Sequence, residues 1–205
     1  MSSQSHATVL ALSALLLLGC NTSAPSGPVF SAWQGDISFD FADPVGDTLP
    51  APAGEVGEVI DLVQIEGQIT EAAVTIQLRF SAPITRFTDG QVNGLSGFVD
   101  FDVDENAGTG VEAAVDALGG DTGMGVDFFV NLADNALNQM SLVRATTGAS
   151  LALPFTITGS TVTFSFTRTL LGDEDGNMRI SGVISAGQRP ATDIFPNQGH
   201  LSIRR

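Results

Sequence analysis

Apolar and polar residues alternate with a period of two along most of the chain. The clearest runs have an apolar side chain at every second position: residues 37–41, 74–80, 99–103, 126–132 and 162–166. Such a period buries one face of a β-strand and leaves the other in water. Weaker runs of the same kind cover residues 59–65, 139–145, 151–157, 178–185 and 199–203.

Turn-forming segments separate these runs. Residues 43–47, 158–160 and 173–177 combine Gly with Asp, Asn, Ser or Pro, which favour tight turns. Sustained helical spacing is nearly absent, and only residues 111–118 and 168–171 could form a short helix or one helical turn. The pattern predicts an all-β fold, an antiparallel two-sheet β-sandwich that is jelly-roll-like, with about nine to eleven strands and few short helical turns.

The N-terminal region contains a short apolar run that ends at Cys20, the only cysteine of the chain. This run is too short to span a bilayer but has the length of the apolar segment of a secretory signal. Leu17-Leu18-Gly19-Cys20 resembles the lipobox of bacterial lipoproteins, in which the signal is cleaved before the cysteine and the thiol carries lipid. The alternative is a plain secretory signal in which the position of Cys20 is coincidental.

The lipoprotein resemblance implies both a division of the chain and a location. We expect residues 1–19 to be the signal peptide, residues 20–33 a lipidated tether and residues 34–205 the β-sandwich domain. Lipid on Cys20 would hold the domain at a membrane of the cell envelope, which we expect to be the bacterial outer membrane or the cell surface. The expected partners are therefore that membrane and a glycan or an envelope protein.

Composition excludes several kinds of chemistry. The formal net charge is −15, and such an acidic surface repels phosphate backbones, so no nucleic-acid partner is expected. The chain has no lysine, which rules out a Schiff-base lysine and a P-loop lysine. Beyond residue 19 the only histidine is His200, so a zinc site with several imidazoles cannot form. No nucleophile motif accompanies His200, and the sequence predicts no catalytic residue.

The segment Asp100-Phe101-Asp102-Val103-Asp104-Glu105-Asn106 is the strongest candidate for metal chemistry. If the strand continues to Asp104, carboxylates at every second position project from one face within about 7 Å of one another and repel. Calcium binds carboxylate, amide and backbone oxygens, all of which this segment offers. The segment is not an EF-hand, because the sixth position from Asp102 is Ala107 and the twelfth is Ala113. The alternative is a solvated strand edge followed by a turn.

Several short Asp- and Gly-containing motifs occur in a fixed order, at residues 43–47, 101–110, 125–130, 171–176 and 192–197. This order resembles bacterial secreted β-sandwich domains similar to family 9 carbohydrate-binding modules and DOMON domains. The resemblance implies a two-sheet sandwich and a calcium ion bound near Asp102, Asp104, Asn106 and Asp127. Sugar binding in such modules uses aromatic platforms, and the only tryptophan here is Trp33, beside the tether.

These observations favour a surface-anchored, non-catalytic binding or structural module that calcium stabilises. The alternative is a carboxylate-based glycoside hydrolase or another envelope enzyme, since two carboxyl groups about 5–9 Å apart would suffice chemically. A subunit of a larger envelope assembly is a third hypothesis. A concave cleft with two buried carboxyl groups beside aromatic rings would indicate the enzyme, whereas a filled sandwich would indicate the module.

Overall fold

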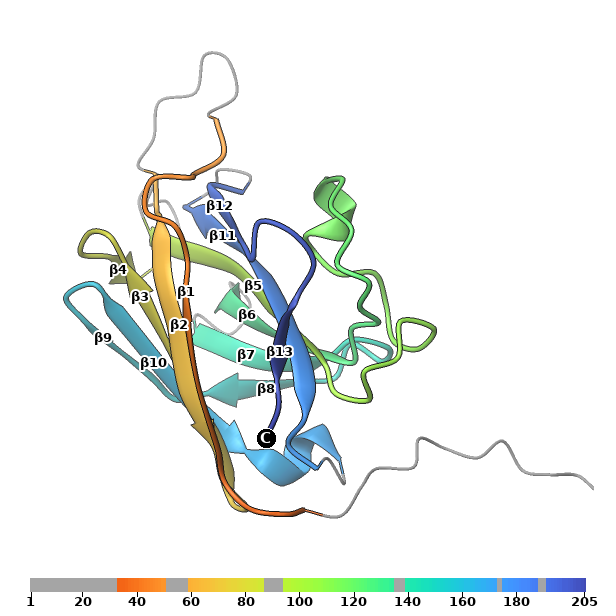
Figure 1. Ribbon diagram of the computed structural model, residues 1–205. Helices are drawn as coiled ribbons and strands as arrows, with labels where there is room; N and C mark the ends of the chain where they lie inside the picture. The colour runs from red at the N-terminus through yellow and green to blue at the C-terminus, as the bar shows by residue number, and fades with distance from the viewer. Residues whose placement is uncertain (1–32, 51–58, 87–93, 135–138, 173–174, 188–190) are drawn as a thin grey trace, which may run out of the picture.

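The computed structural model (Figure 1) describes residues 33–50, 59–86, 94–134, 139–172, 175–187 and 191–205. The expected signal peptide, Cys20 and the expected tether as far as residue 32 lie outside the described residues. Within the described part of the chain, no helix has the length and apolar character needed to cross a membrane.

Two sheets face each other across the core. The first has five strands in the order β1 (Ile37–Ala42), β2 (Leu62–Ile69), β3 (Ala73–Phe80), β10 (Thr161–Thr167) and β9 (Phe155–Thr158). The main path of the second runs β12 (Asp193–Phe195), β11 (Met178–Ala186), β5 (Gly94–Asp102), β6 (Phe128–Asp134), β7 (Gln139–Arg144) and β8 (Ser150–Leu153). In addition, β13 (Leu201–Ile203) pairs with β11, and β4 (Thr85–Arg86) pairs with β5. Every pairing is antiparallel except that of β4 with β5.

The core consists of the apolar side chains on the inner faces of the two sheets. Phe101 of β5 and Phe166 of β10 meet across it edge to face, with ring centroids 6.0 Å apart. Each aromatic or aliphatic side chain buried in this way contributes about 1.5–3 kcal/mol relative to leaving it in water. The residues that alternate with a period of two therefore place their apolar side chains in the core, as expected. The predicted all-β antiparallel sandwich is confirmed.

The described residues form thirteen strands, more than the nine to eleven expected. Part of the difference comes from Pro154, which divides the predicted run 151–157 into β8 and β9. Proline has no N–H to donate to a ladder, and here the chain passes from the second sheet to the first. The other additional strands, such as β4 and β12, are too short for alternation to reveal them.

The long connection between β5 and β6, residues 103–127, lies on the outer face of the second sheet. Figure 1 shows it as the green segment beside β5 and β11. Ala113, Met124 and Val126 form a small buried apolar cluster there, against which Phe129 of β6 packs. The short helix expected at residues 111–118 is only a 3₁₀ turn, η1 (Asp116–Leu118). This connection supplies most of the polar contacts of the candidate site.

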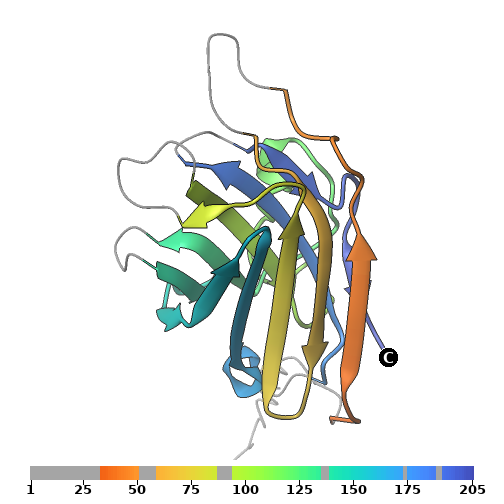
Figure 2. The same ribbon diagram turned by 90° about the vertical axis from the view of Figure 1, so that its left-hand side faces the viewer.

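Trp33 fixes the chain just before β1. Its ring packs against the core, with the guanidinium of Arg168 4.6 Å and that of Arg205 5.8 Å from the ring centroid. Arg168 begins the 3₁₀ turn η2 (Arg168–Leu171), and Arg205 ends the chain. Figure 2 shows the first sheet from outside, with β1 in orange along its edge. Trp33 therefore attaches the incoming segment to the sandwich.

Candidate metal centre

Three carboxylates converge where β5 ends and β6 begins. Asp102 is the last residue of β5, Asp104 follows it in the connection, and Asp127 directly precedes β6. One carboxylate oxygen of each residue lies within 4.8 Å of the other two. The antiparallel pairing of β5 with β6 brings these ends together, and the Asp127 N–H donates to the Phe101 carbonyl at 2.9 Å. We call these three residues the Asp102 cluster.

The chain reverses direction at Glu105, which adopts φ = 53°. A non-glycine residue rarely adopts a positive φ, so the surrounding contacts must hold it there. Beyond the reversal, the Asn106 N–H lies 3.1 Å from Asp102 Oδ1 and 3.0 Å from Asp104 Oδ1. The Glu105 carboxylate pairs with Arg204, whose Nη2 is 2.8 Å from Oε1. The turn thereby places the side chain of Asp104 beside that of Asp102.

Two further contacts shape the loop around these carboxylates. The Thr109 hydroxyl lies 2.9 Å from Asp104 Oδ1, and the Asn106 side-chain carbonyl accepts a hydrogen bond from the Gly108 N–H at 3.0 Å. A Cβ atom at Gly125 would lie 2.1 Å from the Thr109 carbonyl oxygen and 2.5 Å from that of Asn106. The loop therefore packs directly on the backbone of Gly125, and only glycine fits at this point.

Burial dominates the electrostatics of the cluster. Asp102 is fully buried; burial raises its pKa, and the Gly125 N–H and the Arg179 guanidinium at 3.3 Å oppose this shift. Burial also raises the pKa of Asp127 to about 6, with a smaller contribution from the charges of Asp104 and Asp102. One guanidinium beside three carboxylates leaves the group negative, so a divalent cation would be bound favourably.

The structure brings together three of the four predicted ligands. Asp102, Asp104 and Asp127 converge, whereas the side chain of Asn106 hydrogen-bonds within the loop and its backbone N–H serves the carboxylates. The condition that the strand continue to Asp104 is not met, because β5 ends at Asp102. Asp100 lies apart from the cluster: it is 3 % exposed and accepts a hydrogen bond from the Ala114 N–H at 2.7 Å.

A small pocket opens beside the cluster. Asp104 and Asp127 line it together with Phe128, Arg144 and Leu171, and its volume is about 150 Å³. The Arg144 guanidinium lies over the Phe128 ring, 4.7 Å from its centroid. Small-molecule sites usually have volumes of about 300–1,000 Å³, so this pocket could admit an ion and its water but not a large ligand.

A second group of carboxylates lies elsewhere in the fold, where the sequence indicated only a turn. One carboxylate oxygen of Asp43, one of Asp47 and one of Asp193 lie within 4.8 Å of one another. Two aspartates in the turn at residues 43–47 were a signal for part of this group, but nothing local connects them to Asp193. Both groups could bind a metal ion.

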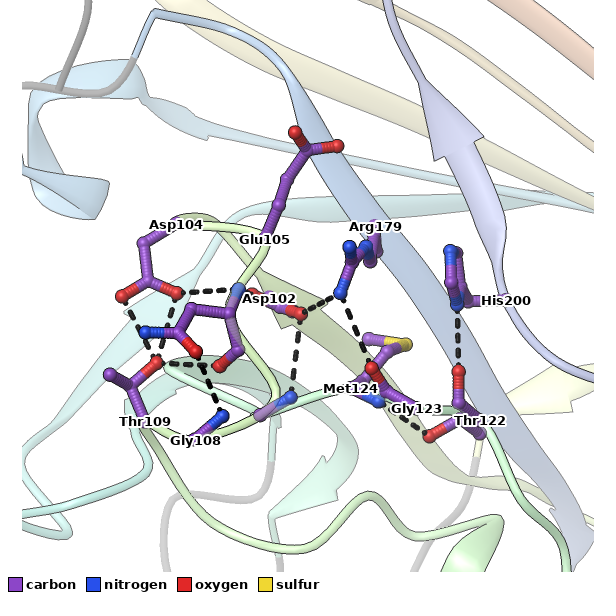
Figure 3. A network of polar contacts seen from close by, with 12 residues as sticks. Asp102, Asp104, Glu105, Gly108, Thr109, Thr122, Gly123, Met124, Arg179 and His200 are labelled. Atoms are coloured by element: carbon purple, nitrogen blue, oxygen red, sulfur yellow. Dashed lines mark hydrogen bonds and ion pairs between the residues drawn. The ribbon is translucent and has the colours of Figure 1, made fainter.

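The remaining candidates have structural contacts. His200 Nδ1 lies 2.7 Å from the Thr122 carbonyl oxygen, so its ring fixes the connection over the sheet (Figure 3). In the acidic segment 173–177, Asp175 Oδ1 accepts a hydrogen bond from the Asn177 N–H at 2.8 Å, as in a turn. Residues 173 and 174 of this segment lie outside the described residues.

No protein-family model, no curated protein and no solved structure matches the chain. The resemblance to carbohydrate-binding modules and DOMON domains stays a prediction.

Proposed function

We propose that this protein is a non-catalytic module of the cell envelope that calcium stabilises at the Asp102 cluster. The convergence of three carboxylates, from the end of β5, the following loop and the start of β6, supports this proposal. Without a cation, their mutual repulsion is opposed only in part, by the guanidinium of Arg179 and by backbone N–H groups such as that of Asn106. A lipid on Cys20 would hold the module at the membrane, as the sequence predicts.

The donor set favours calcium over other metals. All three side chains offer carboxylate oxygen, which suits calcium and magnesium, whereas zinc prefers sulfur and nitrogen ligands. Calcium accepts six to eight oxygens in flexible geometry, but magnesium requires a near-ideal octahedron at about 2.0–2.1 Å. The ligands here come from a strand end and an irregular loop, which suits the more tolerant ion.

Calcium would fasten the connection 103–127 to the sheet. Asp104 belongs to that connection, and Asp102 and Asp127 lie at the strand ends that flank it. An ion that binds only the folded protein stabilises it by about 2.7 kcal/mol when its free concentration is one hundred times Kd. The expected consequence is a calcium-dependent rise in melting temperature.

The dimensions of the site favour a module over a glycoside hydrolase. The adjacent pocket of about 150 Å³ is small for a sugar chain, and apolar side chains fill the space between the sheets. The partner of the module, which we expect to be a glycan or an envelope protein, is best sought with a glycan array.

The test compares the chelator-treated protein with and without calcium by thermal unfolding and calorimetry. In the double variant Asp104→Asn/Asp127→Asn we expect an isosteric site that has lost two charges, and therefore one fewer bound calcium ion and a smaller rise in melting temperature. Asp40→Asn is the matched control, because Asp40 is an exposed aspartate of β1 outside the cluster. A double variant that binds calcium as well as the wild type would overturn the proposal.

A further inference from the structure

The second group of carboxylates, Asp43, Asp47 and Asp193, lies where the two sheets meet at one end of the sandwich. A fourth carboxylate, that of Asp61, lies beside them and contacts the turn at Gly46. Asp43 follows β1 and Asp61 precedes β2, both in the first sheet, whereas Asp193 begins β12 of the second. The Leu49 N–H donates to the Thr192 carbonyl at 2.8 Å, and the Thr192 hydroxyl lies 3.0 Å from the Ile60 carbonyl oxygen. These contacts hold the segments together at the upper end of the view in Figure 1.

Two of these carboxylates are held rigidly by backbone groups. Asp193 is fully buried, and its Oδ2 and Oδ1 accept hydrogen bonds from the Leu62 N–H at 2.7 Å and the Ile194 N–H at 2.8 Å. Asp61 is 7 % exposed, and the Gly46 N–H lies 3.2 Å from each of its carboxylate oxygens. The contact between the Gly46 N–H and the Asp61 carboxylate also positions the turn that carries Asp43 and Asp47.

Each of the two other carboxylates has a buried oxygen that finds no partner among the described residues. Asp43 Oδ2 and Asp47 Oδ1 each expose less than 1 Å² and make no hydrogen bond to this part of the chain. Buried polar atoms in folded proteins almost always have a partner, so two orphaned anionic oxygens in one cluster require an explanation. A cation between them would provide the missing partner for both.

The negative charge of these four carboxylates also favours a bound cation. Within the described part of the chain, none of the four carboxylates forms an ion pair with an arginine. In the Asp102 cluster, by contrast, the Arg179 guanidinium forms an ion pair with Asp102 and offsets part of the charge.

We propose that Asp43, Asp47 and Asp193 form a second site for a divalent cation, calcium by its donor set, with Asp61 supporting the turn. The ion clamps the connection between β1 and β2 to β12, and so joins the two sheets at this end. The site shares no residue with the Asp102 cluster, so either site can exist without the other.

Native mass spectrometry of the full-length protein, first treated with chelator and then titrated with calcium chloride, counts the ions. We expect two calcium ions in the wild type, one in Asp43→Asn/Asp47→Asn and one in Asp104→Asn/Asp127→Asn. Loss of even an outer-shell partner usually weakens metal binding about 10–100-fold, so loss of two ligands should weaken this site at least about 100-fold. Asp40→Asn should bind as many ions as the wild type.

The variants leave the anchoring backbone contacts of Asp61 and Asp193 intact, and without calcium they relieve repulsion. We therefore expect Asp43→Asn/Asp47→Asn to melt at a higher temperature than the wild type in chelator and to gain less from calcium. Equal ion counts in this variant and the wild type would overturn the second site, whatever the result at Asp104 and Asp127. Loss of an ion only in Asp43→Asn/Asp47→Asn would support the second site and overturn the first.

Discussion

Asp100 provides the sharpest test of the electrostatics, because it is buried but belongs to neither cluster. It lies on the outer face of β5, 3 % exposed, opposite Ser181 of β11, whose buried hydroxyl oxygen has no hydrogen-bond partner among the residues that the structure describes. Burial raises the pKa of Asp100 to about 6; the Ala114 N–H at 2.7 Å opposes the shift and the charge of Asp116 adds to it. Ionised Asp100 should therefore destabilise the fold.

The size of this effect follows from proton linkage. An aspartate in the unfolded chain has a pKa of about 3.9, so the folded protein binds the proton more tightly between about pH 4 and pH 6. The contribution of Asp100 to the free energy of unfolding is therefore greatest in acid and falls as pH rises through that window. Two pKa units correspond to about 3 kcal/mol, which is an upper limit.

Asp100→Asn removes the ionisation but keeps the shape and an acceptor for the Ala114 N–H. The pKa of about 6 already includes the hydrogen bond from the Ala114 N–H to the charged carboxylate, so the loss of that charged acceptor needs no separate correction. We expect the variant to be more stable than the wild type by about 1–2 kcal/mol at neutral pH and to show no gain near pH 4, where both side chains are neutral.

Urea denaturation followed by circular dichroism, at several pH values between about 4 and 7.5, measures this difference. Chelator should be present throughout, so that bound cations do not contribute. Asp40→Asn, on an exposed face of β1, is the control and should show no comparable pH-dependent gain. A difference between Asp100→Asn and the wild type that is the same at every pH, or a variant less stable at neutral pH, would refute the reasoning.

Three other changes have defined outcomes. Gly125→Ala places a Cβ 2.1 Å from the Thr109 carbonyl oxygen. We therefore expect the free energy of unfolding, measured with urea, to fall by about 1–3 kcal/mol and calcium binding, measured by calorimetry, to weaken. An unchanged calcium affinity would mean that the loop does not shape the site. Phe101→Ala opens a cavity between the sheets and should cost about 3–5 kcal/mol by the same measurement, whereas a cost below about 1 kcal/mol would contradict the filled core. Cys20→Ala should move the protein from the membrane fraction to the soluble fraction on ultracentrifugation, and continued sedimentation with membranes would contradict the lipid anchor.

The strands were predictable because the alternation of apolar and polar residues indicates which side chains are buried. The strand ends were not predictable, because burial does not stop where the hydrogen-bonded ladder stops. Val103 is 4 % exposed although β5 ends one residue earlier, so the pattern continues past the last ladder pair. The opposite error affects β2, which was expected at residues 59–65 but runs from Leu62 to Ile69. There Gly67 interrupts the apolar pattern, because a Cβ at this position would lie 2.6 Å from the Phe39 ring.

The two acidic clusters differ in how far the sequence reveals them. Asp102 and Asp104 are close in sequence, so local spacing was enough to suggest part of a site, whereas the resemblance to known β-sandwich domains added Asp127. The second group, Asp43, Asp47 and Asp193, depends on where the turn after β1 lies relative to β12, which belongs to the other sheet. No periodicity encodes that contact, because it results from the way the two sheets pack.

Asp100 and the clusters represent two different solutions to the burial of carboxylates. A single buried carboxylate can be neutralised by one proton, and its pKa of about 6 shows that this proton is lost near neutral pH. In a cluster, several protons would have to bind at once, and each is lost as pH rises. One divalent cation neutralises two carboxylates together and is held more firmly as they ionise. The stability of the cation-free clusters should therefore fall with rising pH, whereas calcium should stabilise the protein most where protons have left.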